Sequence, residues 1–275
     1  SKLDKIRMAA LQHVLKTGLP NTKYRGWNYT ELKWWLGFTF SKKNMNFSNQ
    51  SEYLKLLPKE SEFFIILLNG EVQVQLSKLP QNISITQLQH VDESLRSDVL
   101  NNPQLKKNTF AQLNCGLAKN GFLLNTLNEG AAKPINILYI NSSVDNKNCL
   151  NQIHNIYILS PGSQLTIIER FWSSGGAHFN NTVSQSFLSP GSELTKYSLG
   201  NMGSHNKMCK SVNTEFIQQK RNSTSMLYTF YFSNGKFKCD GMIRNNIQIE
   251  LDEGGGKCDV NSISMLSDNT HVDNN

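Results

Sequence analysis

The side chains best suited to chemistry in this sequence are its five cysteines and six histidines. Thiolates and imidazoles are natural ligands for transition-metal ions. The cysteines are odd in number, far apart and without a C-x-x-C pair, so we expect reduced thiols rather than a disulfide framework. Cys239, Cys258 and His271 lie in the strand-rich part of the chain and are the candidate metal ligands. The competing interpretation is that each cysteine packs as a small buried hydrophobe.

Other reactive side chains form no recognisable catalytic group. Glu169 and Asp240 are acids, but the sequence places no second carboxylate beside either of them. The stretch EGGGKC (residues 253–258) lacks the spacing of a phosphate-binding loop, and a bend between strands is expected there instead. His178 and His205 stand among Gly, Ser and Asn, as solvated loop residues do. We therefore predict no catalytic residue and no enzyme.

The elements that must position these side chains begin with helices. Apolar residues recur three and four apart over residues 2–17 and predict an amphipathic helix. Gly18 would end this helix and Pro20 would prevent it from resuming. A second helix is predicted from Thr30, whose hydroxyl would cap it.

A hairpin and a further helix follow in the first half of the chain. EFFIILLNGEVQVQL (residues 62–76) is two strand-like runs around Asn69-Gly70, a strong hairpin signal, and its second run alternates cleanly with polar residues. Thr109 is expected to cap a helix that ends at Gly121. After residue 122 we predict short strands and no helix. The chain would thus divide into an N-terminal helical region with the hairpin (1–121) and a β region (122–275).

One internal repeat bears on the architecture of the β region. ILSPGSQLT (Ile158–Thr166) returns as FLSPGSELT (Phe187–Thr195), 29 residues later. Pro-Gly marks a tight turn in both copies, and an alternating strand follows each. Regular turns with strands between them predict either stacked rungs or a sandwich of regular strands.

Composition excludes several classes of protein. Only 18% of residues are charged, and the net charge of +7 comes from scattered Lys and Arg, so nucleic-acid binding is not favoured. The aromatic run MLYTFYF (residues 226–232) would stack bases in a nucleic-acid reader, but strand faces directed at a core and at a partner explain it better. No window reaches the roughly 18 apolar residues that a membrane helix requires, so no membrane partner is expected.

Several segments, in order, resemble one known family. GLPNTKYRGWNYTEL near the start is similar to the N-terminal signature of SufD proteins. Four further segments are similar to later parts of SufD proteins, in the same order: FAQLNCGLAKNGFLL, NIYILSPGSQLTIIERF, FNNTVSQSFLSPGSELTKYSL and IRNNIQIELDEGGGKCDVNSISM. The resemblance covers nearly the whole chain. Its signature positions here, with an expected structural role, are Gly18, Pro20, Trp27, Tyr29 and Thr30.

The resemblance implies a fold and a function. The fold would be mainly β, a right-handed parallel β-helix preceded by a small helical region with a hairpin. The protein would be a non-catalytic scaffold subunit of the SufBCD complex, which assembles iron–sulfur clusters. It would pair with SufB through the β-helices and meet the ATPase SufC through a C-terminal region absent here. This chain alone would bind no cofactor stably; a nascent Fe-S cluster would form in the full complex, in the cytoplasm or, alternatively, a plastid.

The resemblance also limits what can be carried over to this chain. The three candidate ligands would face an inner channel or the SufB side of the β-helix. The best-supported SufD ligand region lies beyond residue 275, so it matches no position here. The β-helix would be incomplete at its C-terminal end, and we expect an exposed last strand there, with unpaired backbone groups.

Two functions from other classes stay open at this point. A β-helix carbohydrate-active enzyme would need an export signal and an acidic cluster on one strand face, and neither is visible. A basic nucleic-acid-binding protein would bind nucleic acid with an affinity that falls steeply as the salt concentration rises.

Overall fold

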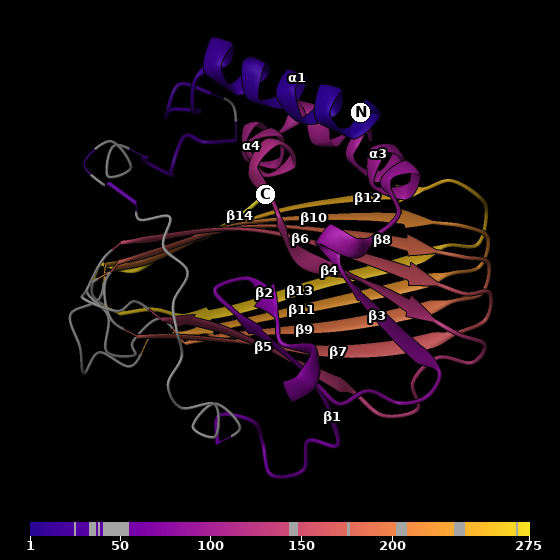
Figure 1. Ribbon diagram of the computed structural model, residues 1–275. Coiled ribbons are helices and arrows are strands. Elements are labelled where there is room, and N and C mark those ends of the chain that lie inside the picture. Colours follow the sequence, from indigo (N-terminus) through magenta and orange to yellow (C-terminus); the bar gives the residue numbers. More distant parts are fainter. Residues whose placement is uncertain are drawn as a thin grey trace.

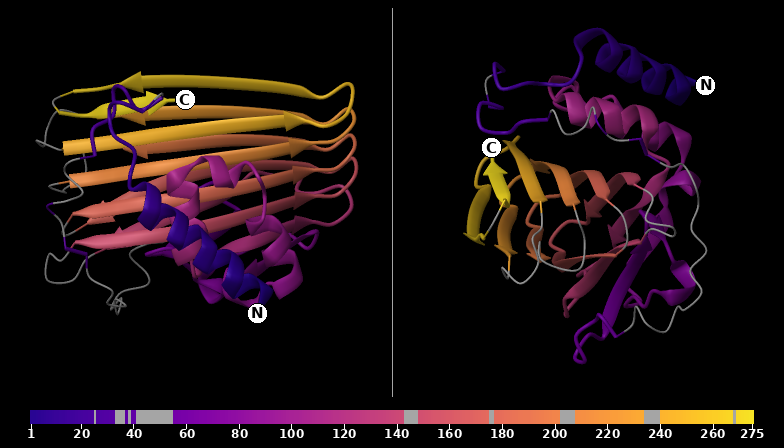
Figure 2. Two further views of the ribbon diagram at one scale, coloured as in Figure 1. Left: turned by 90° about the horizontal axis from the view of Figure 1, so that it is seen from above. Right: turned by 90° about the vertical axis from the view of Figure 1, so that its left-hand side faces the viewer.

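Two seven-stranded sheets face each other, and from β4 onward the chain crosses from one sheet to the other after each strand (Figures 1 and 2). The structure is a computed structural model that describes residues 1–24, 26–32, 37, 39–40, 55–142, 148–174, 177–201, 208–233, 240–267 and 269–275. Successive strands of a sheet come from successive turns and pair in parallel. The mainly-β prediction is therefore confirmed, as a parallel β-solenoid.

The first sheet, here called sheet one, has its strands in the spatial order β13-β11-β9-β7-β5-β1-β2. Their bounds are β1 (Phe63–Leu68), β2 (Glu71–Val72), β5 (Ile135–Ser142), β7 (Gln164–Ser174), β9 (Glu193–Asn201), β11 (Thr224–Phe232) and β13 (Lys257–Met265). Sheet two has the order β14-β12-β10-β8-β6-β4-β3. Its bounds are β3 (Ile83–Gln87), β4 (Asn120–Thr126), β6 (Cys149–Leu159), β8 (His178–Leu188), β10 (Met208–Gln219), β12 (Asp240–Leu251) and β14 (His271–Asn274).

Helices cover the outer face of sheet two and leave most of sheet one uncovered (Figure 2). They are α1 (Lys2–Thr17), α3 (Glu93–Leu100) and α4 (Thr109–Leu117), with short 3-10 turns η2 (Val74–Leu76), η3 (Leu88–His90) and η4 (Leu105–Lys107). Helix α4 packs directly on β6, β8 and β10, and α1 lies over α4. Within the described ranges, no helix has the length and apolarity needed to cross a membrane.

The repeated turns explain how the solenoid keeps its register. Gly162 and Gly191 take positive φ angles of 68° and 69° at equivalent positions of the two repeat copies. Asn222 takes φ 57° at the corresponding point of the next turn, so the motif continues there without Pro-Gly. In each turn a serine hydroxyl closes the bend by donating to a backbone carbonyl three residues earlier. The stacked-rung interpretation of the repeat is confirmed, and the sandwich alternative is wrong.

The N-terminal helix agrees with its prediction, whereas the second predicted helix does not begin at Thr30. Helix α1 spans Lys2–Thr17 and stops at Gly18, whose φ is 71°. Residues 30–32 are not helical, and residues 33–36 lie outside the described part of the chain. The Thr30 hydroxyl contacts Asp273 and lies 3.2 Å from His271, so a tertiary contact takes the place of a helix cap.

The predicted hairpin forms, but its second strand is short. Asn69 and Gly70 take φ angles of 47° and 84° between β1 and β2, as a tight hairpin turn requires. Strand β2 ends after Val72 and residues 74–76 form η2, contrary to the predicted alternating strand. The Ser77 hydroxyl accepts a hydrogen bond from the Ile66 N–H at 3.1 Å, and this side chain replaces the missing strand residues as a partner.

The helix predicted over residues 109–121 begins and ends differently. Its cap is Asn108, whose Oδ1 accepts from the N–H groups of Phe110 and Ala111 at 2.9 and 3.1 Å. It ends at Leu117 and not at Gly121, because Gly121 already belongs to β4 and pairs with β6. The prediction that no helix follows residue 122 holds for the described residues.

A buried histidine joins the helix layer to sheet two. His154 of β6 is fully buried, and its Nδ1 and Nε2 lie 2.9 Å from Asn114 Oδ1 and Gln185 Oε1. Asn114 is held in turn by donating to the carbonyls of Ile153 and Asn181, both at 2.9 Å. Burial lowers the pKa of His154 to about 4, because loss of solvation outweighs the contact with Gln185 that favours the charged ring.

The turn geometry gives the first testable prediction, at Gly191. Replacing Gly191 by Ala should lower the free energy of unfolding by about 1 kcal/mol, because a side chain disfavours the left-handed backbone. Gly191→Asn should cost less than half as much, since Asn222 already holds this conformation in the next turn. Urea unfolding measures both. Equal losses for the two variants would contradict the assigned role of the turn.

His154 gives a second prediction, on pH dependence. Its pKa is lowered in the fold from 6.5 to about 4, so the stability it contributes is complete above pH 6.5 and is lost as the pH falls to about 4. This group alone should remove about 3 kcal/mol over that interval, at 1.36 kcal/mol per pKa unit. His154→Gln should flatten that part of the pH profile of unfolding, and His13→Gln on exposed α1 should leave it unchanged. Identical profiles for wild type and His154→Gln would show the prediction to be wrong.

Candidate functional site: the polar interior of the solenoid

The interior of the solenoid changes from apolar to polar along the stack of turns. Every second side chain of a strand points into the space between the sheets. In the first turns these positions hold residues such as Ile65, Phe122 and Ile137, which form the main core. In later turns the same columns hold charged and amide side chains, and several of these are almost completely buried.

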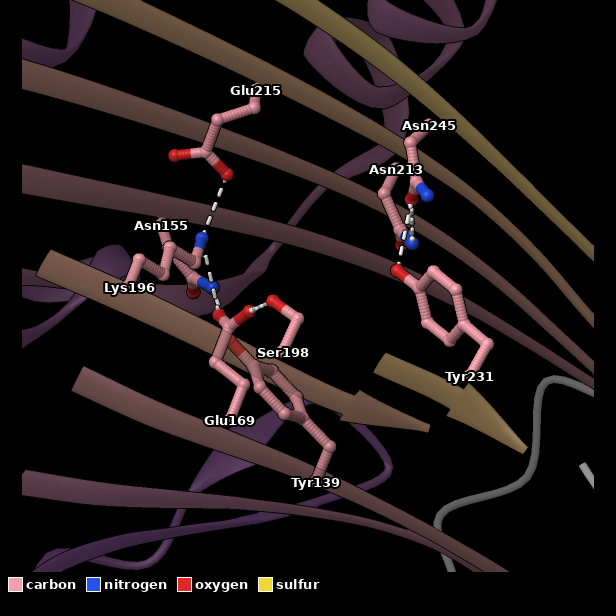
Figure 3. Close-up of polar contacts among 9 residues, drawn as sticks. All are labelled: Tyr139, Asn155, Glu169, Lys196, Ser198, Asn213, Glu215, Tyr231 and Asn245. Atoms are coloured by element: carbon pink, nitrogen blue, oxygen red, sulfur yellow. Dashed lines mark hydrogen bonds and ion pairs between the residues drawn. The ribbon is translucent and has the colours of Figure 1, made fainter. Parts of the chain in front are cut away.

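A buried lysine between two glutamates is the centre of this polar interior (Figure 3). Lys196 on β9 lies 3.2 Å from Glu169 Oε1 on β7 and 2.7 Å from Glu215 Oε2 on β10. Lys196 and Glu169 are only 5% and 4% exposed. Charges so far from water are tolerated only when partners surround them, so the register of three strands must hold this cluster together.

Hydroxyl groups hydrogen-bond to both carboxylate oxygens of Glu169, whereas one oxygen of Glu215 has no such partner among the described residues. The Ser198 hydroxyl donates to Glu169 Oε2 at 2.7 Å, and the Tyr139 hydroxyl donates to Glu169 Oε1 at 3.1 Å. Tyr139 accepts in turn from the Asn155 amide at 2.8 Å. Glu215 Oε1 has no hydrogen-bond partner among the described residues.

The pKa shifts follow from this geometry. Burial acts to lower the pKa of Lys196, but the two carboxylates together outweigh it and hold the pKa above its ordinary value. Burial raises the pKa of Glu215 more than the nearby ammonium lowers it. Burial also raises the pKa values of Tyr139 and Tyr231. Lys196 is therefore a fixed cation and not a nucleophile or base, since it carries no free electron pair at neutral pH.

A small cavity separates the lysine cluster from a ladder of asparagines. Asn213 donates to Asn245 at 2.9 Å, and Asn245 donates to Asn274 at 2.8 Å, each on the next turn. The Tyr231 hydroxyl donates to Asn245 Oδ1 at 3.2 Å (Figure 3). The cavity of about 50 Å³ has walls of mixed character, with polar side chains such as Glu215 beside apolar ones such as Leu227, and it has room for a few water molecules.

The three predicted metal ligands do not come together in the described structure. Cys239 lies outside the described residues. Cys258 is half-buried on β13 beside Ser225, whereas His271 lies on β14 in the other sheet and faces Thr30. Within the described ranges, no three His, Cys, Asp or Glu side chains are grouped to hold a metal ion.

Two other expectations about single residues are corrected. His178 is not a solvated loop residue: it is the first residue of β8 and is fully buried, because it pairs with Cys149 on β6 and Cys209 on β10 and faces the interior. Glu169 does have a second carboxylate nearby, Glu215, which lies 46 residues away in sequence and comes close because sheet two faces sheet one. His205 and the side chain of Asp240 lie outside the described structure.

Two sequence patterns keep the roles expected for them. EGGGKC forms the bend between β12 and β13, with Gly255 at φ 81°. The aromatic run of β11 directs Leu227 and Tyr231 inward, while Tyr228 stacks on Tyr197 at 5.1 Å. Both faces of this strand are thus apolar in part.

Sequence reasoning missed a column of sulfur and imidazole side chains. Cys149, His178 and Cys209 are strand partners in three successive turns, β6, β8 and β10. Their spacings along the chain are 29 and 31 residues. The first equals the repeat shift, so applying the repeat to every cysteine and histidine would have found this pair.

The signature residues lie where the N-terminal segment meets the last strand. Trp27 stacks on Phe110 at 5.3 Å, and the Arg244 guanidinium lies 4.1 Å above the Trp27 ring. Arg244 and Thr30 both contact Asp273 on β14. Gly18 ends α1 and Pro20 is buried, whereas the Tyr29 side chain is 87% exposed.

The lysine cluster gives the third prediction. Lys196→Met should lower the free energy of unfolding by about 3–5 kcal/mol, because it leaves two buried carboxylates without their cation. Adding Glu169→Gln and Glu215→Gln to this variant should recover most of the loss. Lys133→Met, at an exposed ion pair with Glu62, should change it by less than about 1 kcal/mol. Chemical unfolding monitored by circular dichroism measures all three, and no recovery in the triple variant would argue against charge burial as the cause.

The comparisons with known proteins agree with this architecture. Residues 141–275 match the SufBD core domain of the SUF system of FeS cluster assembly. No curated protein is significantly similar to the chain in sequence. The matched region runs from the end of β5 to β14 and so includes Lys196, the asparagine ladder and the cysteine–histidine column. Residues 141–275 therefore correspond to a SufBD core domain, which supports a role of this chain in FeS cluster assembly.

Proposed function

We propose that this chain is the SufD-like, non-catalytic scaffold subunit of a SufBCD complex. It pairs with SufB through the solenoid and works with the ATPase SufC, and the nascent cluster is cargo of the complex and not a resident cofactor of this chain. The observation that carries the proposal is the SufBD core match over the solenoid turns. The cytoplasm is the proposed compartment, with a plastid as the alternative.

Exposed apolar side chains on sheet one support contact with a related subunit. Ile263 and Met265 on β13 have 55% and 64% of their surfaces exposed, and Phe232, the partner of Met265 on β11, has 43%. Apolar side chains grouped on a sheet face are suited to packing against another protein chain.

The lysine cluster supports a scaffold role more than a catalytic one. Its ammonium is paired with two carboxylates, and Glu169 is further held by Ser198 and Tyr139. A group held in this way is poorly suited to move protons during a reaction, because each protonation change would leave a buried partner unpaired.

The proposed function predicts a complex that can be isolated. The intact natural protein, co-expressed with SufB and SufC of the same source, should elute with both in gel filtration, and omitting SufB should remove it from the complex. ATP hydrolysis should appear only in samples that contain SufC. Leu15→Glu, an exposed position on α1 far from β13, should leave assembly unchanged. Elution of the intact protein alone at every mixing ratio would refute the assignment.

A further inference from the structure

The cysteine–histidine column, defined as Cys149, His178 and Cys209, is arranged as a line of soft ligands inside the solenoid. The three residues are direct partners on parallel strands of sheet two. Side chains at partner positions point to the same side of a sheet and are about 4.8 Å apart. Their strand positions are in phase with inward-facing Ile153, so all three face the space between the sheets.

The surroundings of this column contain neutral polar groups. A cavity of about 30 Å³ adjoins Cys209, and Ser173, Asn180 and Ser211 contribute to its wall. Ser173 Oγ lies 3.7 Å from Cys209 Sγ. No carboxylate lines this cavity in the part of the chain that the structure describes. Thiolate and imidazole ligands without carboxylates favour soft transition-metal ions over Mg²⁺ or Ca²⁺.

The spacing of the column decides how many of its members can share one ion. Neighbouring members are one strand spacing apart, which metal–sulfur and metal–nitrogen bonds of about 2.3 and 2.1 Å can bridge. The two cysteines are two strand spacings apart, about 9.6 Å. That exceeds the roughly 7 Å limit between the Cα atoms of a disulfide, so these thiols do not oxidise to each other without backbone movement.

We propose that the column binds one divalent transition-metal ion, of the class to which Fe²⁺ belongs, through His178 and the thiolate of Cys209, the column cysteine that adjoins the cavity. This inference rests on the proposed function and adds to it an ion-loading site within this chain. Binding releases the thiol proton to solvent as the metal–sulfur bond forms. Two protein ligands leave positions on the ion open, as suits an ion that is passed on and not kept.

Cys115 shows what a purely structural cysteine looks like in this protein. It lies on α4, is 1% exposed, and burial raises the pKa of its thiol to about 12. It packs against Leu3, Ala111 and their neighbours in the cluster between the helices and sheet two. Because it is a thiol outside the column, it is the matched control for the column cysteines, with Cys258 on β13 as a second control.

Cobalt titration of the reduced, intact protein tests the proposal, because Co²⁺ bound to a thiolate gives a charge-transfer band in the near ultraviolet. One equivalent should bind, and excess Mg²⁺ should not displace it. The Cys149→Ser/Cys209→Ser double variant should lose the band, and His178→Asn should weaken binding at least tenfold. Cys115→Ser and Cys258→Ser should bind as the wild type does. A wild-type protein without the band, or a double variant that keeps it, would overturn the proposal.

A second measurement needs no variant and holds even if the double variant does not fold. Bound Co²⁺ should slow the alkylation of Cys209 by iodoacetamide, followed by mass spectrometry, and should leave the alkylation of Cys258 unchanged. Equal protection of both cysteines, or of neither, counts against the site. Co-elution with SufB, measured on the same samples, separates the two hypotheses: cobalt binding without SufB pairing refutes the scaffold role and leaves the site standing.

Discussion

The parallel register between successive turns is the constraint on which the rest of this structure depends. Each turn satisfies the backbone N–H and C=O groups of the one before it, so a slip by one residue would turn every later side chain to the opposite face. Left-handed residues at Gly162, Gly191 and Asn222 keep the bends equivalent. Because the register is strict, chemically similar side chains form columns, and Asn213 and Asn245 hydrogen-bond from turn to turn.

The same register makes a charged interior tolerable. Ile137 and Ile217 show that apolar residues fit the inner face of these strands, so Lys196, Glu169 and Glu215 are not required for packing. Buried ion pairs seldom add net stability over well-packed apolar residues, because desolvation offsets most of their attraction. Buried polar residues that add little stability are expected mainly at functional positions. The polar interior is therefore the part of the fold in which function is to be sought.

How far the sequence predicts this structure depends on whether a feature is local. Helix α1, the Asn69-Gly70 turn and the 29-residue repeat are local patterns, and all three are found as expected. Helix α3 and the lysine cluster were not predicted. The apolar stripe of α3 is short, and the cluster unites residues from three strands whose pairing no local pattern reveals. Thr30 illustrates the same limit: its best partner, Asp273, lies at the other end of the chain.

The interior combines two chemically distinct zones in one solenoid. The cysteine–histidine column lies at the start of strands β6, β8 and β10 of sheet two. On β10, Cys209 precedes Glu215 by six residues, which separates the two side chains by about 20 Å along the strand. One zone offers sulfur and imidazole, which suit soft metals, and the other offers carboxylates already neutralised in part by Lys196. An iron ion that met both zones would bind the soft one better, because the ammonium repels a second cation at the glutamates. Under the proposed ion-loading role, the paired lysine would help to keep the metal at the thiol end of the interior.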